Sequence, residues 1–255
     1  MKKILLSVLC IVLSAVLLSG CVTVDLRYSI MRGASPGGIS VTGTGAQEDF
    51  TFDVSQLTSV TISMFCNIEI YSAPSDTITL RIQPNLMEYI EVNESGGILD
   101  VWSTRNINTT SPNNIPVLTI STPSLSRLTL NGAGKFTVHD TITGDSLTIN
   151  MNGAVDGTAK MDVDNFTVSL AGASDMTFSG RADTANFSIA GAGNISALSL
   201  QTRDSAVNIA GAGTVRINCT DNLKVSAGGV GSVEYTGSPK LDISRGGLVS
   251  VKNVE

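Results

Sequence analysis

The sequence predicts an all-β protein whose C-terminal half winds as a parallel β-helix of about 18–21 residues per coil. A short pattern (apolar, spacer, apolar, spacer, Gly, small, Gly, spacer, apolar) recurs seven times between Leu128 and Val251. Successive copies lie 21, 19, 19, 20, 18 and 18 residues apart, a period that suits one coil of a solenoid. The central glycines are Gly132, Gly153, Gly172, Gly191, Gly211, Gly229 and Gly247.

The glycines keep the same alternation as the apolar residues around them. In one copy the residues of this parity are Val168, Leu170, Gly172, Ser174, Met176 and Phe178. A two-residue hairpin loop would shift the alternation by one residue, whereas a three-residue loop would preserve it, so hairpins stay open as an alternative. A chain that bends without reversing would instead point each glycine inward at a corner with no room for a side chain. That geometry is a parallel β-helix.

The first 20 residues have the features of a lipoprotein signal peptide. Lys2 and Lys3 precede an apolar run from Ile4 to Leu18, which is too short to span a bilayer comfortably as a helix. The run ends in Leu18-Ser19-Gly20-Cys21, which resembles the lipobox of bacterial lipoproteins. We therefore expect Cys21 to be acylated and to anchor the exported protein to a membrane. An ordinary cleaved signal is the alternative.

Two further segments precede the repeats. Residues 21–46 contain a Gly-, Ser- and Pro-rich run and are expected to form a flexible tether after the lipidated cysteine. Residues 47–123 alternate with period two and are expected to form strands that make up the first coils and one cap; the alternating runs are 50–54, 60–64, 68–70 and 78–82. Residues 86–92 could form a short helix, but strand or loop is expected. Residues 124–255 then form the Gly-x-Gly repeat β-helix.

A column of aspartates lies eight residues before the central glycines. Its members are Asp145, Asp164, Asp183 and Asp221, with Asp204 displaced by one place. Each is followed by Ser, Asn or Thr, which favours an Asx-type turn. The alternative is a calcium ladder, because stacked carboxylates repel one another unless they are screened or bridged. The Gly-Gly-rich nonapeptide of calcium-binding β-helices is missing, so no metal site is predicted and these aspartates remain weak candidates.

A second column is formed by the residue between the two glycines of each copy. Its members are Ala133, Ala154, Ala173, Ala192, Ala212, Val230 and Leu248. If the glycines face inward, this column faces outward. Small residues at a tight corner are the ordinary explanation, and a flat docking strip is the alternative.

Composition limits the kinds of partner. The chain has 255 residues, 42% of them hydrophobic, a formal net charge of −6 and a pI near 4.8. It therefore has no basic field to hold a phosphate backbone, and nucleic acid is excluded as a partner. Cys66 and Cys219 belong to the folded part, and two separate buried thiols are favoured over a disulfide bridge.

No cluster of residues points to catalysis, so the protein is predicted not to be an enzyme and to need no cofactor. The single histidine, His139, lies at a polar position of its strand and is expected to face solvent. Carboxylate chemistry remains possible, and Asp156 with Asp175 is the most plausible pair, because they occupy equivalent positions in successive copies.

The Gly-Ala-Gly corners, the stretch Ser124–Gly134 and the lipobox together resemble the putative autotransporter adhesin, head GIN domain family. The resemblance covers residues 47–252 and implies a right-handed β-helix at the cell envelope, without a catalytic motif. The chain departs from the regular pattern at Val155, at Ser174 and in the copy around Gly229.

Three functions are compatible with these observations. The first is a lipid-anchored bacterial surface protein, a putative adhesin, whose β-helix binds a glycan, a cell-wall polymer or a protein. The second is a carboxylate-based enzyme acting on polysaccharides. The third is a structural or regulatory envelope component without a soluble ligand.

Overall fold

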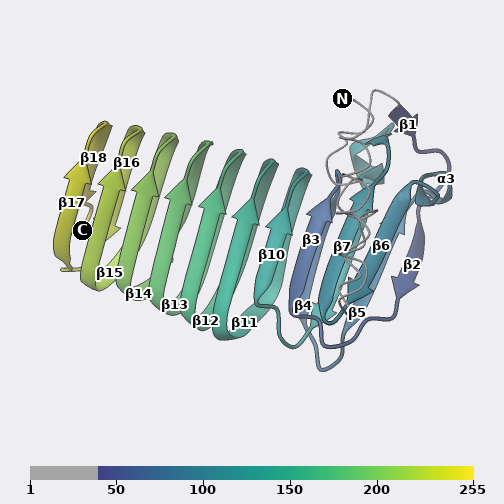
Figure 1. Cartoon of the computed structure of the whole chain (residues 1–255), viewed down its shortest axis with the longest axis horizontal. Coiled ribbons are helices and arrows are strands. Elements are labelled where there is room, and N and C mark those ends of the chain that lie inside the picture. Colours follow the sequence, from purple (N-terminus) through teal and green to yellow (C-terminus); the bar gives the residue numbers. More distant parts are fainter. Residues whose placement is uncertain (1–39) are drawn as a thin grey trace, which may run out of the picture. The chain divides into compact units, whose positions relative to one another are not determined.

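The structure is a computed structural model that describes residues 40–255. These residues belong to one compact unit in which nearly every element is a strand (Figure 1). The predicted signal peptide and the predicted lipidation site, Cys21, lie outside the described residues. No helix within residues 40–255 has the length and apolarity needed to cross a membrane.

The repeats form stacked coils, as the sequence predicts. Each strand from β11 to β15 starts directly after one glycine corner, bends once more, and ends just before the next corner. The bounds are β10 (Arg127–Leu130), β11 (Ala133–Met151), β12 (Ala154–Leu170), β13 (Ala173–Ile189), β14 (Ala192–Ile209), β15 (Ala212–Ala227), β16 (Val230–Thr236), β17 (Lys240–Arg245) and β18 (Leu248–Asn253).

Every pairing among these strands is parallel. The register joins Ala133 to Ala154, Ala154 to Ala173 and so on to Leu248, so the spacing between partners matches the steps read from the sequence. The parallel β-helix is therefore confirmed, and the hairpin alternative is wrong for these residues.

The N-terminal region mixes both strand directions. Its strands are β1 (Ser40–Thr42), β2 (Glu48–Phe52), β3 (Ser59–Ser63), β4 (Asn67–Ser72), β5 (Thr77–Ile82), β6 (Ile90–Ser95), β7 (Ile98–Ser103), β8 (Asn106–Asn108) and β9 (Val117–Thr122). β3 and β4 pair in parallel with β10 and β11 and so continue the stack. β2, β5 and β6 make antiparallel pairs with β5, β9 and β7 respectively.

Two local details differ from the sequence prediction. Residues 86–92 are expected to be strand or loop, but the first of them belong to one helical turn, α3 (Pro84–Met87), which has proline in its first turn. Strand β6 begins only at Ile90. The end of the predicted tether is ordered, because β1 pairs with β8 and Val41 packs against the core. A 3-10 turn, η2 (Pro112–Asn114), precedes β9.

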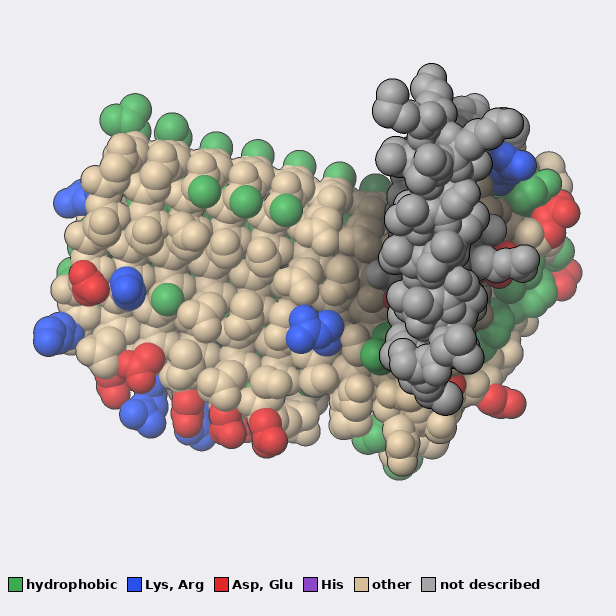
Figure 2. Space-filling model, in the orientation of Figure 1, with side chains coloured by type: hydrophobic (Ala, Val, Ile, Leu, Met, Phe, Trp, Pro, Cys, Tyr) green, Lys and Arg blue, Asp and Glu red, His purple; other side chains and the backbone are tan. Residues whose placement is uncertain are grey.

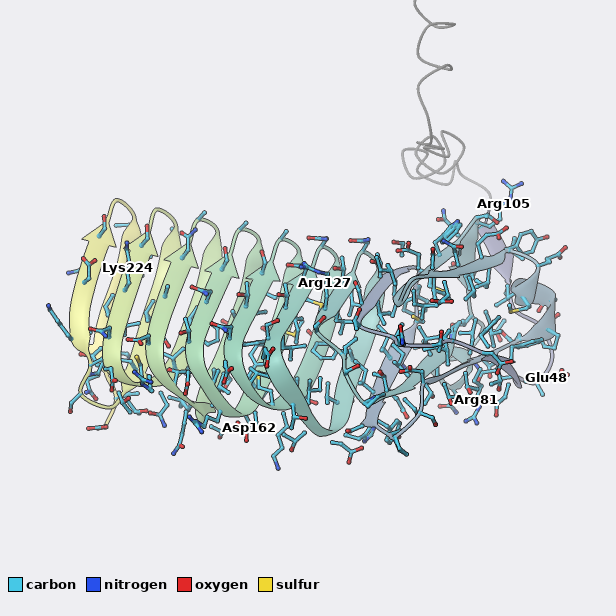
Figure 3. The ribbon with its side chains drawn as sticks, turned by 60° about the horizontal axis from the view of Figure 1, so that its bottom comes forward. Glu48, Arg81, Arg105, Arg127, Asp162 and Lys224 are labelled. Carbon is cyan, nitrogen blue, oxygen red and sulfur yellow. The ribbon has the colours of Figure 1, made fainter. Side chains whose placement is uncertain are left out.

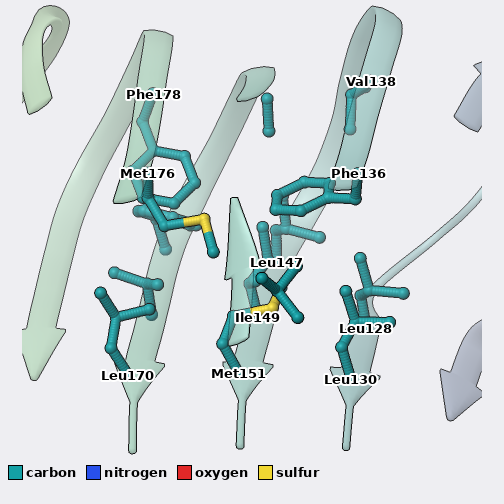
Figure 4. Close-up of a cluster of buried hydrophobic side chains, with 14 of the residues drawn as sticks. Leu128, Leu130, Phe136, Val138, Leu147, Ile149, Met151, Leu170, Met176 and Phe178 are labelled. Carbon is teal, nitrogen blue, oxygen red and sulfur yellow. The ribbon is translucent and has the colours of Figure 1, made fainter. Parts of the chain in front are cut away.

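The core is a single apolar column that runs through the coils (Figure 4). Phe166 contacts the rings of Phe178 and Phe187 edge to face, with centroids 4.9 and 6.0 Å apart. The ring of Phe136 occupies the space beside Gly157 one coil later, where any Cβ would overlap it. The ring of Phe136 thus requires glycine at position 157, and close packing fills the interior.

Candidate binding surface

The corner glycines lie where neighbouring coils make backbone contact. The residue after each corner donates its N–H to the carbonyl of the corner glycine one coil earlier, as Ala173 does to Gly153 at 3.1 Å. This bond holds the carbonyl oxygen against the next glycine, so a Cβ at any corner after the first would overlap it, and at Gly132 the carbonyl of Met64 has this role. The crowding at these corners comes from the stacked backbone of the neighbouring coil.

The residues between the paired glycines form an exposed strip, which we call the apolar ridge. It consists of Ala133, Ala154, Ala173, Ala192, Ala212, Val230 and Leu248, and Figure 2 shows such a row of hydrophobic side chains along one edge of the coils. Most of the ridge is alanine, but Val230 is 56% exposed and Leu248 is 80% exposed. The predicted outward orientation is thus confirmed.

Beside the ridge lies a broad surface with few charges, which we call the hydroxyl–amide face. Its central column is Thr129, Asn150, Ser169, Ser188, Asn208, Ser226 and Ser244, joined strand to strand in register. A second column contains Arg127, Thr148, Thr167, Asn186, Ala206, Lys224 and Asp242. Both columns alternate with buried apolar residues, so their side chains point outward.

The charges of this face lie toward its two ends. Arg127 belongs to the first repeat strand, β10, and Lys224 and Asp242 belong to β15 and β17; Figure 3 labels Arg127 and Lys224 far apart along the stack. The coils between them present hydroxyl and amide groups, which both donate and accept hydrogen bonds. The sequence analysis missed this face, although the third residue before every central glycine is Ser, Thr or Asn.

The carboxylates considered for catalysis have a structural use. Asp156 Oδ1 accepts the backbone N–H of Asp175 at 3.1 Å, and Asp175 Oδ1 accepts the backbone N–H of Asn194 at 3.1 Å. Asn194 Oδ1 in turn accepts the N–H of Thr214 at 3.2 Å. The side chain of each coil thus holds the backbone of the next coil, and the same column continues into neutral residues.

The aspartate column lies at the second bend of each coil and is interleaved with arginines. Arg181 contacts Asp183 at 2.8 Å, and Arg203 contacts Asp221 at 3.4 Å. Asp183, with smaller contributions from Asp162 and Asp164, raises the pKa of the Arg181 guanidinium, while Thr220 and Arg203 lower the pKa of Asp221.

This arrangement bears on both interpretations of the column. All four aspartates (Asp145, Asp164, Asp183 and Asp221) lie within continuous strands. Asp183 and Asp221 bond to side chains rather than to an N–H two residues on, so these two do not form the predicted Asx turns. Within residues 40–255 no three His, Cys, Asp or Glu side chains are grouped to hold a metal.

The single histidine belongs to a small aromatic cluster on the outer surface. His139 stacks on Tyr71 with a centroid distance of 4.4 Å, and its Nε2 lies 3.7 Å from Glu69. Tyr71 donates its hydroxyl to Glu69 at 3.1 Å; partial desolvation and this bond raise the pKa of the phenol. The predicted exposure of His139 is confirmed, since 39% of its side chain is exposed.

The two cysteines of the described chain are buried and unbridged, as favoured from the sequence. Burial raises the pKa of the Cys66 thiol to about 12, so it stays protonated at neutral pH. Cys66 also lines an apolar cavity under the first corner, together with Met64, Leu130 and Val155. This cavity holds about 10 Å³, which is room for about one water.

The family follows from comparison with known sequences. Residues 56–239 match the family described as putative auto-transporter adhesin, head GIN domain. The chain belongs to this family. Membership supports a binding or adhesin role and a surface or envelope location. No curated protein matches the chain.

Solved structures support the fold. A putative adhesin from Bacteroides fragilis NCTC 9343 is 20% identical, with a TM-score of 0.78 over 84% of this chain and 100% of that one. A putative lipid binding protein from Parabacteroides distasonis ATCC 8503 is 22% identical, with a TM-score of 0.68 over 85% and 100%. A putative adhesin from Parabacteroides merdae ATCC 43184 is 19% identical, with a TM-score of 0.61 over 85% and 99%.

Proposed function

We propose that this protein is a non-enzymatic surface lipoprotein that binds an extended, neutral glycan along its hydroxyl–amide face. The observation that carries the proposal is the column from Thr129 to Ser244, in which every coil presents a hydroxyl or amide group at the same position. Coils stack about 4.8 Å apart, so the column offers evenly spaced donors and acceptors to a chain of repeating polar units.

Charge argues for a neutral ligand. The central coils of the face carry no basic residue in either column, and the whole chain has a net charge of −6. A polyanion would therefore gain little attraction there and would be repelled at long range. The columns extend over many coils, which favours an elongated ligand bound by many weak, partly water-mediated contacts.

The test is binding of the full chain to a panel of immobilised neutral and acidic polysaccharides. Ser188→Arg would place a bulky charge in the central column and should weaken binding to the retained neutral polymer by about tenfold, a cost of about 1.4 kcal/mol. Thr177→Arg is the matched control, because Thr177 is exposed on the other side of the same strand, β13. Equal binding by wild type and Ser188→Arg, or equal loss in both variants, would overturn the proposed face.

The proposal includes the lipid anchor at Cys21, which rests on the sequence of residues 1–21. Two or more acyl chains hold a protein on a membrane stably. Cys21→Ser should therefore abolish incorporation of labelled fatty acid and move the protein from the membrane fraction to the soluble fraction after cell lysis. Retention of both the label and the membrane location in this variant would refute lipidation at Cys21.

A further inference from the structure

Both ends of the stack leave strand edges without a partner within residues 40–255. At the C-terminal end, β17 pairs only with β15, and β18 pairs only with β16. At the N-terminal end, β6 pairs only with β7, and β2 pairs only with β5. Each outer edge presents a row of backbone N–H and C=O groups, which is a template for another strand.

The apolar residues of the C-terminal edge are also incompletely covered. Leu241 is 40% exposed, whereas Leu223, its register partner one coil earlier, is fully buried. Likewise, Val251 is half-buried, whereas Val233, its register partner one coil earlier, is buried. The last coil therefore exposes apolar surface that the next coil covers elsewhere in the stack.

The N-terminal edges show the same contrast. Half-buried Val92 on β6 pairs with buried Val101, and half-buried Phe50 on β2 pairs with buried Leu80. α3 contributes the buried Leu86 to the core of this region. The two ends thus share unpaired backbone and partly exposed core.

The charges of the two ends are opposite. β6 carries Glu91 and Glu94, β2 carries Glu48 and Asp49, and neither strand contains a basic residue. β17 and β18 carry Lys240, Arg245 and Lys252 against the single acid Asp242. Two of these charges are already paired within the chain, Asp49 with Arg81 and Lys252 with Glu234. Figure 2 shows mainly acidic side chains at the end near β2 and β6 and a mixture of basic and acidic ones at the other.

The pairing scheme also brings matching edges together. β17 and β6 end one continuous set of paired strands that runs through β10, β3 and β7. β18 and β2 end the other set, which runs through β4, β9 and β5. A second copy placed along the stacking axis therefore meets β17 with its β6 and β18 with its β2.

We propose that this chain binds a second copy of itself end to end, with β17 pairing antiparallel to β6 and β18 pairing parallel to β2. The directions follow from the observed pairs. β17 is parallel to β7, and β6 is antiparallel to β7. β18 is parallel to β9, and β2 is parallel to β9 because β2 and β9 are both antiparallel to β5. The contact joins two different surfaces of the same molecule, so it leaves a free end at each step and extends into a filament. This association does not depend on glycan binding.

The experiment measures the mass of the full chain in detergent solution by sedimentation over a range of protein and salt concentrations. Wild type should associate with increasing concentration, and salt should weaken the association because charged rims contribute to it. Lys240→Glu with Arg245→Glu makes both ends acidic, and Glu91→Lys with Glu94→Lys makes the β6 edge basic. Each double variant should associate about tenfold more weakly than wild type.

Mixing the two double variants supplies the decisive readout, because the reversed charges are complementary again and association should return. Lys160→Glu, a reversal of an exposed charge on the mid-stack strand β12, is the matched control and should associate as wild type does. A wild type that stays monomeric throughout would overturn the proposal. Double variants that assemble like wild type, or that stay apart when mixed, would also overturn it.

Discussion

Glycine has different uses in the two regions of this protein. In the N-terminal region, Gly96 and Gly97 form the turn between the antiparallel strands β6 and β7, with φ values of +60° and +80°. These angles favour glycine because a side chain is strained there. The corner glycines of the repeats have no positive φ, and they are glycine because a carbonyl of the neighbouring coil occupies the place of the side chain.

The difference reflects how each region sets its strand directions. A hairpin turn reverses the chain and is encoded by a few adjacent residues, as between β6 and β7 in the N-terminal region. A corner that bends without reversing is encoded by contact with the corner one coil earlier, 18–21 residues away, except that the first corner, Gly132, contacts Met64. Gly96 is therefore glycine because of its backbone conformation, and the corner residues are glycine because of their packing against a carbonyl.

The largest effect is expected from a side chain at a corner. Gly172→Ala would drive a methyl group into the carbonyl of Gly153, and because this oxygen is hydrogen-bonded to Ala173 it cannot move freely. Overpacking against fixed backbone should lower the free energy of unfolding by about 3 kcal/mol. Chemical denaturation followed by circular dichroism measures this change.

The matched control lies at another corner. A Cβ at Gly228 would meet no atom within 4 Å, and its φ is not positive. Gly228→Ala should therefore change the free energy of unfolding by no more than about 0.5 kcal/mol. Similar losses in both variants would show that backbone flexibility, not the stacked carbonyl, makes the corners glycine.

A smaller effect is expected at the hairpin. A side chain at Gly96 would meet open space, so Gly96→Ala should cost only the strain of a left-handed backbone, about 1 kcal/mol. Gly96→Asn should cost less, because asparagine tolerates this conformation. Urea denaturation compares the two variants, and an asparagine variant no more stable than the alanine variant would contradict the conformational explanation.

The sequence predicted the repeats well because their signal is repeated. Seven glycines at a nearly constant spacing and a constant parity indicated both the coil length and the stacking, and the register reproduces them. The reason for each glycine was not predictable, since it depends on where a carbonyl one coil away points. The antiparallel pairs of the N-terminal region were also not predicted, because alternation shows which residues face inward but not which strand lies beside which.

Two misses had a signal in the sequence. Strand or loop is expected for residues 86–92, although Pro84 just before them favours the first turn of a helix, where α3 begins. The hydroxyl–amide face has its signal in the third residue before each central glycine, which is always Ser, Thr or Asn. Outward polar residues look ordinary in a single strand, and only their alignment over successive coils distinguishes the face.

The smallest effect is expected from an exposed ion-pair network that ties the last coils together. Glu234 on β16 contacts Arg216 on β15 at 2.8 Å and Lys252 on β18 at 3.0 Å. The hydrogen bonds from Arg216 and then Lys252 hold the pKa of Glu234 below its usual value of 4.5. A depressed carboxyl pKa stabilises the folded state fully above the usual value, and this contribution is lost as the pH falls through the folded pKa.

Glu234→Gln should therefore unfold slightly more easily than wild type at neutral pH, and the difference should shrink toward zero as the pH falls below 4.5. Glu91→Gln, the same change on the exposed edge strand β6, is the control from the other region. Thermal unfolding measured between neutral and acidic pH separates the two variants. If the stability difference between wild type and Glu234→Gln grows on acidification, Glu234 stabilises the fold in its protonated form, which would contradict this explanation. If the difference decreases in high salt at neutral pH, the ion pairs between coils are its cause.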